Sequence, residues 1–197
     1  DFTEPTGALT IPSIVSNGGS TYNVTAIGNR AFYDCRGLTL VTIPNSVTSI
    51  EWNAFDDCRG LTSVTIPNSV TCIGEYAFYY CSGLTSLTIP NSVTTIGSHA
   101  FNSCDHLTNL RFGSGLQSIG GGAFEGCTQM VRIKSYATTA PTIVSTTFKG
   151  LSDDVILNVP CGYGSVYENA AYWHRFDIQE DLMYDFSVIP QDPSRGT

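Results

Sequence analysis

The sequence predicts a repeat solenoid of about six coils: right-handed coils of 23 residues, with a parallel sheet on one face, short helices or turns on the other, and a cap at each end. Three features recur at that step: an Ala-Phe pair, a cysteine and a large apolar residue. A unit this short cannot cover its own apolar face, so each copy must stack on its neighbours. The copies are Ala31-Phe32, Ala54-Phe55, Ala77-Phe78, Ala100-Phe101 and Ala123-Phe124; Cys35, Cys58, Cys81, Cys104 and Cys127; and Leu38, Leu61, Leu84, Leu107 and Met130.

Composition limits the classes of function open to this chain. Of its 197 residues, 42% are hydrophobic, which is enough for a packed core, and 13% are charged, with a net charge of −8. Nucleic-acid binding needs clustered basic side chains, and the sequence has no run of Lys or Arg. The apolar runs are far shorter than the roughly 20 residues that span a bilayer. The polar remainder is largely Ser, Thr and Asn, a composition that suits extracellular repeat proteins.

Residues 1–26 are predicted to form a hairpin-like N-terminal cap, because the end of a stacked array needs an atypical unit to cover it. The apolar residues within 9–15 suggest one extended piece. Asn17-Gly18-Gly19 then favours a hairpin turn, since glycine accepts the backbone angles that such turns require. The solenoid proper is expected to span residues 27–134.

The unit from Leu61 to Gly83 illustrates how one coil is expected to fold. A short strand over 61–66 is rich in β-branched residues and ends at Pro67, which has no N–H to donate. A turn and a second extended piece follow, and residues 75–81 are predicted to form a brief helix that Gly83 ends in the left-handed conformation. Eight positions should be buried, and they recur in the next coil as Leu84, Leu87, Ile89, Val93, Ile96, Ala100, Phe101 and Cys104.

Five of the seven cysteines occupy one repeat position and should form a ladder along the stack. Neighbouring rungs would be roughly 4.8 Å apart, but their Cβ atoms would point in parallel and would not converge as a disulfide requires. We therefore expect buried free thiols that act as small apolar groups with a weak donor. A metal site is not expected, because the spacing offers no Cys-x-x-Cys pair. Cys72 and Cys161 fall outside the ladder.

The repeat becomes irregular near the C-terminus, where residues 135–182 are predicted to form a last coil and a cap. Ser165 and Glu168 match a capping box, which predicts a short helix over 166–173. The remaining expected elements are a last strand at 155–159, a final edge strand at 176–178 and a tail over 183–197, all within one structural domain.

The repeat can be written A-F-x-x-C-x-x-L-x-x-[VL]-x-I-P-N-S-V-x-x-I. Over residues 27–133 this pattern resembles the BspA-like (treponemal-type) leucine-rich repeat of bacterial surface proteins. The resemblance implies an α/β solenoid of the leucine-rich-repeat type and a secreted or cell-surface binding protein of the adhesin class. The order of Val159, Pro160, Gly162, Tyr167, Trp173, Phe176 and Ile178 is similar to the closing unit of the same family, from which Cys161 is a departure.

Residues with catalytic potential are not arranged for catalysis. His99, His106 and His174 lack the partners at helical spacing that a metal site or a general base would show. The adjacent carboxylates Asp56-Asp57 and Asp153-Asp154 cannot face each other across a cleft as the acids of a glycosidase do, and we interpret them as solvated surface groups. We therefore expect no catalytic, cofactor-binding or metal-binding residue, and a hydrolase is the least favoured function.

Two surfaces are candidate ligand-binding sites. The first is an aromatic edge, where rings from successive coils should cluster and could stack on sugars or contact a protein. The second is the face of the parallel sheet, where two basic residues interrupt neutral Ser and Thr ladders. The aromatic edge comprises Trp52, Tyr76, Tyr79, Tyr80 and His99, and the sheet face comprises Ser63, Thr65, Ser86, Thr88, Asn109, Arg111 and Lys134.

These observations predict a non-enzymatic extracellular recognition or adhesion module that binds a host or matrix protein through one broad face. Export is compatible with a sequence that shows no signal peptide after Asp1, because processing removes such a segment. Carbohydrate binding by the aromatic edge is the first alternative, and a passive spacer within a larger surface protein is the second. In either binding role, protein or glycan, the partner is expected outside the cell.

Overall fold

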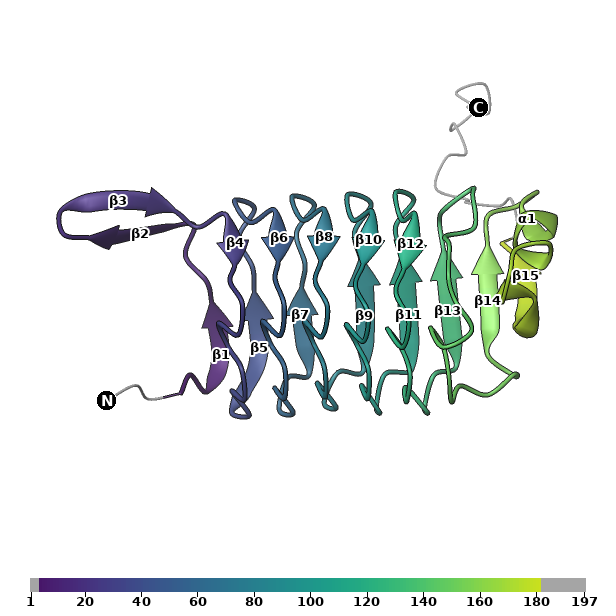
Figure 1. The fold of residues 1–197 in the computed structure, drawn as a ribbon, viewed down its shortest axis with the longest axis horizontal. Coiled ribbons are helices and arrows are strands. Elements are labelled where there is room, and N and C mark those ends of the chain that lie inside the picture. Colours follow the sequence, from purple (N-terminus) through teal and green to yellow (C-terminus); the bar gives the residue numbers. More distant parts are fainter. Residues whose placement is uncertain (1–3, 182–197) are drawn as a thin grey trace, which may run out of the picture.

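The computed structural model describes residues 4–181, which form a solenoid of about seven turns of roughly 23 residues with little helix. Figure 1 shows the turns stacked side by side along one axis. The repeat solenoid predicted from the spacing is therefore confirmed. The count of about six coils was low, because strand β1 (Gly7–Thr10) already pairs in parallel with the next strand of the main sheet.

One face of the solenoid is a parallel sheet whose strands are mostly one repeat apart. The sheet has two parts, with strand orders β1-β5-β7 and β9-β11-β13-β14-β15. The register follows the repeat, since Ser86 pairs with Asn109 and Asn109 with Arg132. Side chains alternate between core and solvent, so equivalent residues form ladders on the outer surface. The strands after β1 are β5 (Leu38–Thr42), β7 (Ser63–Thr65), β9 (Ser86–Ile89), β11 (Asn109–Phe112), β13 (Arg132–Ser135), β14 (Ile156–Val159) and β15 (Asp177–Glu180).

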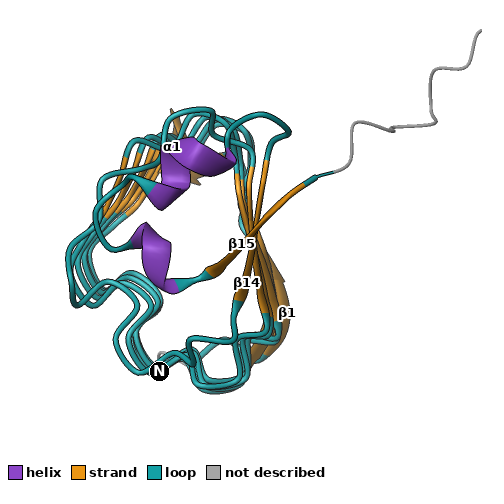
Figure 2. Ribbon diagram, turned by 90° about the vertical axis from the view of Figure 1, so that its right-hand side faces the viewer, coloured by secondary structure: helices purple, strands orange, loops and turns teal. Residues whose placement is uncertain are grey.

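A second column of two-residue strands forms another side of the solenoid. These strands pair in parallel in the order β4-β6-β8-β10-β12. In the end-on view of Figure 2 the two columns lie on different sides of the cross-section, and turns join them. The strands of this column are β4 (Ala26–Ile27), β6 (Ser49–Ile50), β8 (Cys72–Ile73), β10 (Thr95–Ile96) and β12 (Ser118–Ile119).

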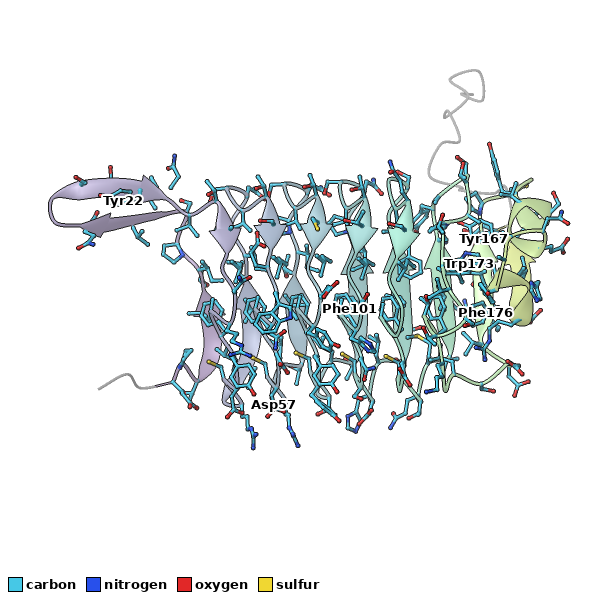
Figure 3. The ribbon with its side chains drawn as sticks, in the orientation of Figure 1. Tyr22, Asp57, Phe101, Tyr167, Trp173 and Phe176 are labelled. Atoms are coloured by element: carbon cyan, nitrogen blue, oxygen red, sulfur yellow. The ribbon has the colours of Figure 1, made fainter. Side chains whose placement is uncertain are left out.

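A column of stacked phenylalanine rings runs through the core. From Phe32 to Phe148, successive ring centroids are 5.0–5.5 Å apart and the ring planes are nearly parallel. Figure 3 shows this column, with Phe101 at its centre. All eight core positions predicted for the coil that begins at Leu84 are buried, whereas Val64 in the preceding coil is only half-buried.

The third side consists of turns, where the sequence predicted a brief helix over residues 75–81. Tyr76 and Tyr80 have φ angles of 56° and 55°, and left-handed residues interrupt the hydrogen bonding of a helix. The N–H groups of Tyr76, Phe78 and Tyr80 donate instead to carbonyl groups of the following coil over 2.7–3.0 Å. The helix prediction is wrong because stacking satisfies donors that a helix would satisfy internally.

Gly83 also has a different role from the predicted one. It does not adopt the left-handed conformation expected at the end of a helix. A Cβ atom at Gly83 would lie 2.7 Å from the carbonyl oxygen of Arg59 in the preceding coil, and one at the equivalent Gly60 would lie 2.3 Å from that of Arg36. Glycine at this position therefore permits close approach of two coils.

The five ladder cysteines are buried at equivalent positions of successive coils, as the repeat predicts. Four of them donate their thiol to the carbonyl oxygen of a phenylalanine in the preceding coil over 3.0–3.5 Å, as Cys58 does to Phe32. Burial raises the pKa of Cys127 to about 12 and holds the pKa of Cys81 and of Cys104 well above its usual value. Each ladder thiol thus combines an apolar surface with a donor for a buried carbonyl.

We expect a chromogenic thiol reagent to label only the two exposed cysteines, Cys72 and Cys161, rapidly in the native protein. The ladder thiols should react only after unfolding, because they are shielded and protonated when buried. In denaturant without reductant, absorbance should report at least five reactive groups, and mass spectrometry should locate them. If denaturant adds none to the two exposed groups, the ladder is bridged and the prediction is wrong.

The N-terminal segment differs in part from the prediction. The hairpin is present, with β2 (Ile14–Asn17) antiparallel to β3 (Ser20–Asn23) across Gly18-Gly19. The single extended piece predicted within residues 9–15 is absent: β1 joins the main sheet, and Pro12, which cannot donate to a ladder, separates it from β2. Every residue of β2 and β3 is exposed, and Figure 1 shows the hairpin projecting beyond the first coil.

The C-terminal end of the stack is covered by short helical segments (Figure 2). Helix α1 (Gly164–Glu168) and the 3-10 helix η1 (Trp173–Arg175) replace the single helix predicted over 166–173, because Tyr172 between them is left-handed with φ 66°. The predicted capping box is wrong, since Tyr163 is the N-cap residue and no side chain caps the helix. The strands predicted at 155–159 and 176–178 are present as β14 and β15, whereas the predicted tail over 183–197 lies outside the described residues.

Two buried aromatic residues close the phenylalanine column at this end. Trp173 lies 5.5 Å from the ring of Phe148, and its indole N–H donates to the carbonyl oxygen of Pro141 over 2.7 Å. The hydroxyl of Tyr167 donates to the carbonyl oxygen of Ala137 over 2.9 Å. Both rings therefore cover the core while their polar atoms remain hydrogen-bonded.

Phe101→Ala should lower the free energy of unfolding by about 3–5 kcal/mol, because removal of a fully buried ring leaves a cavity within the column. Phe32→Ala is the matched control, since Phe32 ends the column and is only half-buried, and it should cost clearly less. Urea unfolding followed by circular dichroism measures both changes. Equal losses would contradict the stacked column.

Candidate binding surfaces

The sheet face brings together residues that the sequence predicted as a binding site. Thr88, Arg111 and Lys134 are paired neighbours on β9, β11 and β13. The predicted residues of this face are exposed, except Lys134, which is half-buried. The remaining members are Ser86 on β9, Asn109 on β11, and Ser63 and Thr65 on β7, beside the break between the two parts of the sheet.

Three basic side chains line one hollow of about 370 Å³ in this face. Arg111 on β11 and Arg132 and Lys134 on β13 surround it, together with Asn109 and Leu110. Arg132 was missing from the residues predicted for this site. It follows Asn109 by one repeat of 23 residues, so the ladder that contains Ser63, Ser86 and Asn109 could have identified it.

Tyr136 holds two of these cations in place. The guanidinium of Arg111 lies 5.4 Å from the centre of the Tyr136 ring and donates to its hydroxyl, and the ammonium of Lys134 lies 5.1 Å from the same centre. Lys134 also pairs with Asp181 over 2.8 Å, and this hydrogen bond raises the pKa of Lys134. Tyr136 and Asp181 were not among the predicted site residues, because neither belongs to a repeated position.

Two further hollows continue the row, the second beside the basic hollow and the third beside the second. The second has about 300 Å³, shares Arg111 with the basic hollow, includes Tyr136, and is partly apolar. The third has about 280 Å³ and is lined mainly by hydroxyl side chains. Apolar or aromatic residues of the second hollow include Ile66, Ile89, Pro90, Phe112 and Tyr136, and the third is lined by Ser63, Val64, Thr65, Ile66, Ser86 and Thr88.

Four of the five residues predicted for the aromatic edge form one contiguous group. Tyr76 stacks on His99 with ring centroids 5.0 Å apart and meets Tyr79 edge-on at 5.3 Å. Tyr79 in turn meets Tyr80 at 4.4 Å. The rings therefore pack mainly on one another, and Tyr76, Tyr79 and His99 are half-buried.

Few ring faces of this edge are open to a ligand. Burial and the neighbouring Tyr80 raise the pKa of Tyr79 to about 12, as expected for a hydroxyl held among other rings. Trp52 and Tyr80 are each 40% exposed. The guanidinium of Arg30 lies 4.5 Å from the centre of the Trp52 ring, and that of Arg59 lies 5.6 Å from the centre of the Tyr80 ring. This edge is thus a weaker candidate than the sheet face.

The carboxylates of Asp56 and Asp57 are buried, so their interpretation as solvated surface groups is wrong. Burial and then the charge of Asp57 raise the pKa of Asp56 to about 6. Although burial opposes it, hydrogen bonds from Arg59 and Arg36 hold the pKa of Asp57 below its ordinary value. Figure 3 shows Asp57 on the turn side of the stack. The coils on either side of these residues exclude solvent, which a linear sequence does not reveal.

Asp56→Asn should make the protein more stable at neutral pH relative to the parent. The folded-state pKa of about 6 exceeds the ordinary value of 3.8, so Asp56 contributes stability below about pH 4 that is lost as the pH rises through 6. The parent should therefore lose about 1–3 kcal/mol across this window that the variant keeps. Urea unfolding at several pH values measures the difference. Asp105→Asn, at an exposed position, is the control, and identical pH profiles for parent and D56N would contradict the assignment.

The histidines make local contacts. His106 Nδ1 lies 2.6 Å from the carbonyl oxygen of Ser82, and His99 Nδ1 lies 3.0 Å from the amide nitrogen of Asn102. Within residues 4–181, no group of three or more His, Cys, Asp or Glu side chains could hold a metal ion. The short helices of the same region lack the length and apolarity needed to cross a bilayer.

Known structures share this architecture. T. pallidum leucine-rich repeat protein (TpLRR) is 31% identical with a TM-score of 0.60, over 64% of this chain and 57% of that one. A leucine-rich repeat protein from Bacteroides ovatus is 24% identical with a TM-score of 0.54, over 91% and 46%. The pneumococcal vaccine antigen PcpA is 19% identical with a TM-score of 0.70, over 89% and 41%. The last two comparisons establish the fold alone, and this chain spans about half the length of these structures.

The repeat also matches a known sequence family. None of the curated proteins compared matches the chain. The family model described as "BspA type Leucine rich repeat region" matches residues 20–154 in six copies, which is more than half of the sequence. This chain therefore belongs to the BspA-type leucine-rich repeat family.

Proposed function

We propose that this chain is a non-enzymatic extracellular recognition module that binds a protein through the face of its parallel sheet. The observation that carries this proposal is the row of three adjoining hollows over β7, β9, β11 and β13. Hydroxyl, apolar and basic groups follow one another along this row. Such a mixed surface can contact several kinds of side chain at once, as a protein interface requires.

The rigidity of the sheet supports the same function. Arg111 is held between its neighbours Thr88 and Lys134 by the backbone pairing of β9, β11 and β13. Side chains on paired strands lose little backbone freedom on binding, which lowers the entropic cost of association. The chain also belongs to a family of protein-interaction repeats.

An extracellular setting is supported by the surface chemistry. Only 13% of the residues are charged, and threonine hydroxyls on the surface bond to the backbone of the preceding coil. Examples are Thr62, Thr71, Thr94 and Thr108, whose hydroxyls donate over 2.9–3.3 Å. A hydroxyl-rich exterior with few charged residues depends little on ion pairs that salt would screen.

Carbohydrate binding by the aromatic edge is the second candidate, supported by the exposure of Trp52 and Tyr80. The packing of the other rings on one another and the cations near Trp52 and Tyr80 leave less area for a sugar to stack upon. A passive spacer is the third candidate function. It predicts that substitutions on either surface leave binding to every ligand unchanged.

Thr88→Trp should reduce binding to immobilised extracellular-matrix proteins by at least about tenfold, because a large side chain at an exposed position between two hollows blocks the face. Surface plasmon resonance with a panel of such proteins measures the change, and circular dichroism checks the fold. Trp52→Ala, on the aromatic edge, is the control and should bind as the parent does. Glycan-array binding that is lost in Trp52→Ala and kept in Thr88→Trp would favour the carbohydrate alternative and contradict the proposal.

A further inference from the structure

The basic hollow concentrates positive charge in an acidic protein. The chain has nine Lys and Arg residues and a net charge of −8. Three of the nine, Arg111, Arg132 and Lys134, line this one hollow. The face on its β7 and β9 side is built mainly of uncharged Ser and Thr side chains, whereas on the other side Asp181 pairs with Lys134, so Arg111 and Arg132 carry the unpaired positive charge. A local positive field of this kind attracts an anionic group and repels a cationic one.

The two arginines of the hollow are not neutralised within the described part of the chain. Elsewhere, basic residues such as Arg36, Arg59 and Lys149 form ion pairs with carboxylates. Among residues 4–181, no carboxylate lies within ion-pair distance of Arg111 or Arg132. Their guanidinium groups therefore keep the capacity to bind an external anion, and the contact with Tyr136 already orients that of Arg111.

The geometry of the three cations suits carboxylates on an extended peptide. A guanidinium donates two parallel hydrogen bonds to a carboxylate, which a single ammonium cannot do. Arg132 and Lys134 are two residues apart on one strand, which places them about 7 Å apart along it. Alternate side chains of an extended peptide have the same spacing. Two acidic residues of such a peptide could therefore face Arg132 and Lys134 together.

The neighbouring hollow indicates what else the partner carries. It begins at Arg111, which also lines the basic hollow, and at Tyr136, which contacts Lys134. Its exposed apolar surface comes from the Tyr136 ring, which is 38% exposed, and from the half-buried Pro90, because Phe112 is fully buried. An apolar side chain would remove water from these groups. A sulfated glycan offers repeated anions but no apolar side chain, whereas a protein segment offers both.

We propose that the hollow at Arg111, Arg132 and Lys134 and the adjoining hollow beside Tyr136 form a docking site for an acidic segment of a partner protein. An Asp or Glu side chain of the partner enters the basic hollow, and an apolar side chain next to it enters the second. This inference rests on the proposed function, because it names the chemistry of the partner for the same face.

The test uses the full chain and a fluorescein-labelled peptide in which glutamate and phenylalanine alternate. Three comparison probes are a peptide with glutamine in place of glutamate, one with serine in place of phenylalanine, and heparin. Fluorescence anisotropy should show binding of the first peptide that weakens with added salt. The glutamine and serine peptides should each bind on the order of tenfold more weakly. Heparin should not displace the first peptide more effectively than an equal charge of polyglutamate does.

Variants locate the site. Arg111→Gln and Arg132→Gln should each weaken the glutamate–phenylalanine peptide on the order of tenfold, since each removes a charge-assisted hydrogen-bond donor. Arg111→Gln also removes the contact with Tyr136, so a loss of affinity in that variant can reflect a local change of structure. Arg132→Gln avoids this ambiguity, because among the described residues the Arg132 side chain makes no hydrogen bond or ion pair that would be lost. Lys149→Gln is the matched control: it removes the same charge from an exposed pair with Glu125, away from the lining of the three hollows, and should leave affinity unchanged.

The inference is overturned if the glutamine peptide binds as tightly as the glutamate peptide, or if Arg132→Gln behaves like Lys149→Gln. It is also overturned if heparin alone binds through the three basic residues, which would make the partner a sulfated glycan. If Thr88→Trp abolishes binding to a matrix protein while Arg132→Gln leaves it unchanged, the proposed function stands and this inference fails. If Thr88→Trp has no effect either, both fail.

Discussion

The structure depends on contact between equivalent residues of successive coils. Rings of the phenylalanine column stack at 5.0–5.5 Å, and thiols of the cysteine ladder donate to phenylalanine carbonyls of the preceding coil. In the turns, alternate N–H groups bond to the following coil. Burial of one large apolar side chain contributes about 1.5–3 kcal/mol, which cannot fix a coil of this length alone. Each coil is therefore stable only when packed against its neighbours. The first and last coils lack a neighbour on one side, so other residues must cover their apolar surface there.

The core is covered differently at the two ends of the stack. At the C-terminus, Trp173 packs on the last ring and Tyr167 packs on Trp173, while their polar atoms bond to the backbone. At the N-terminus, Phe32 is half-buried and the hairpin projects without packing on the core. The difference follows from sequence content, since large aromatic residues able to close a core are gathered after the last coil. Stability should accordingly be lower at the first coil than in the middle of the stack.

The need for contact between equivalent residues of successive coils restricts the interior of the solenoid but not the outer face of the sheet. Inward positions repeat because each must match its copies above and below. Outward positions on the sheet are free of that demand, so a ladder can change from Ser86 to Asn109 to Arg132 without disturbing the core. Binding chemistry can therefore differ between coils of one scaffold. In this chain it changes most around β11 and β13, where the hydroxyl ladder gives way to arginine and lysine.

The period of 23 residues by itself determined the solenoid, the phenylalanine and cysteine ladders and the sheet-face residues, because a stacked array places every equivalent residue in line. Extending the ladder of Ser63, Ser86 and Asn109 by one more repeat of 23 residues would also have identified Arg132. Only the tertiary structure decided the turns, where Tyr76 and Tyr80 become left-handed because their backbone donors find acceptors in the next coil. It also decided the burial of Asp56 and the positions of Tyr136 and Asp181 beside the basic hollow. These features arise from contacts between coils or with the irregular C-terminal part, and no local pattern encodes them.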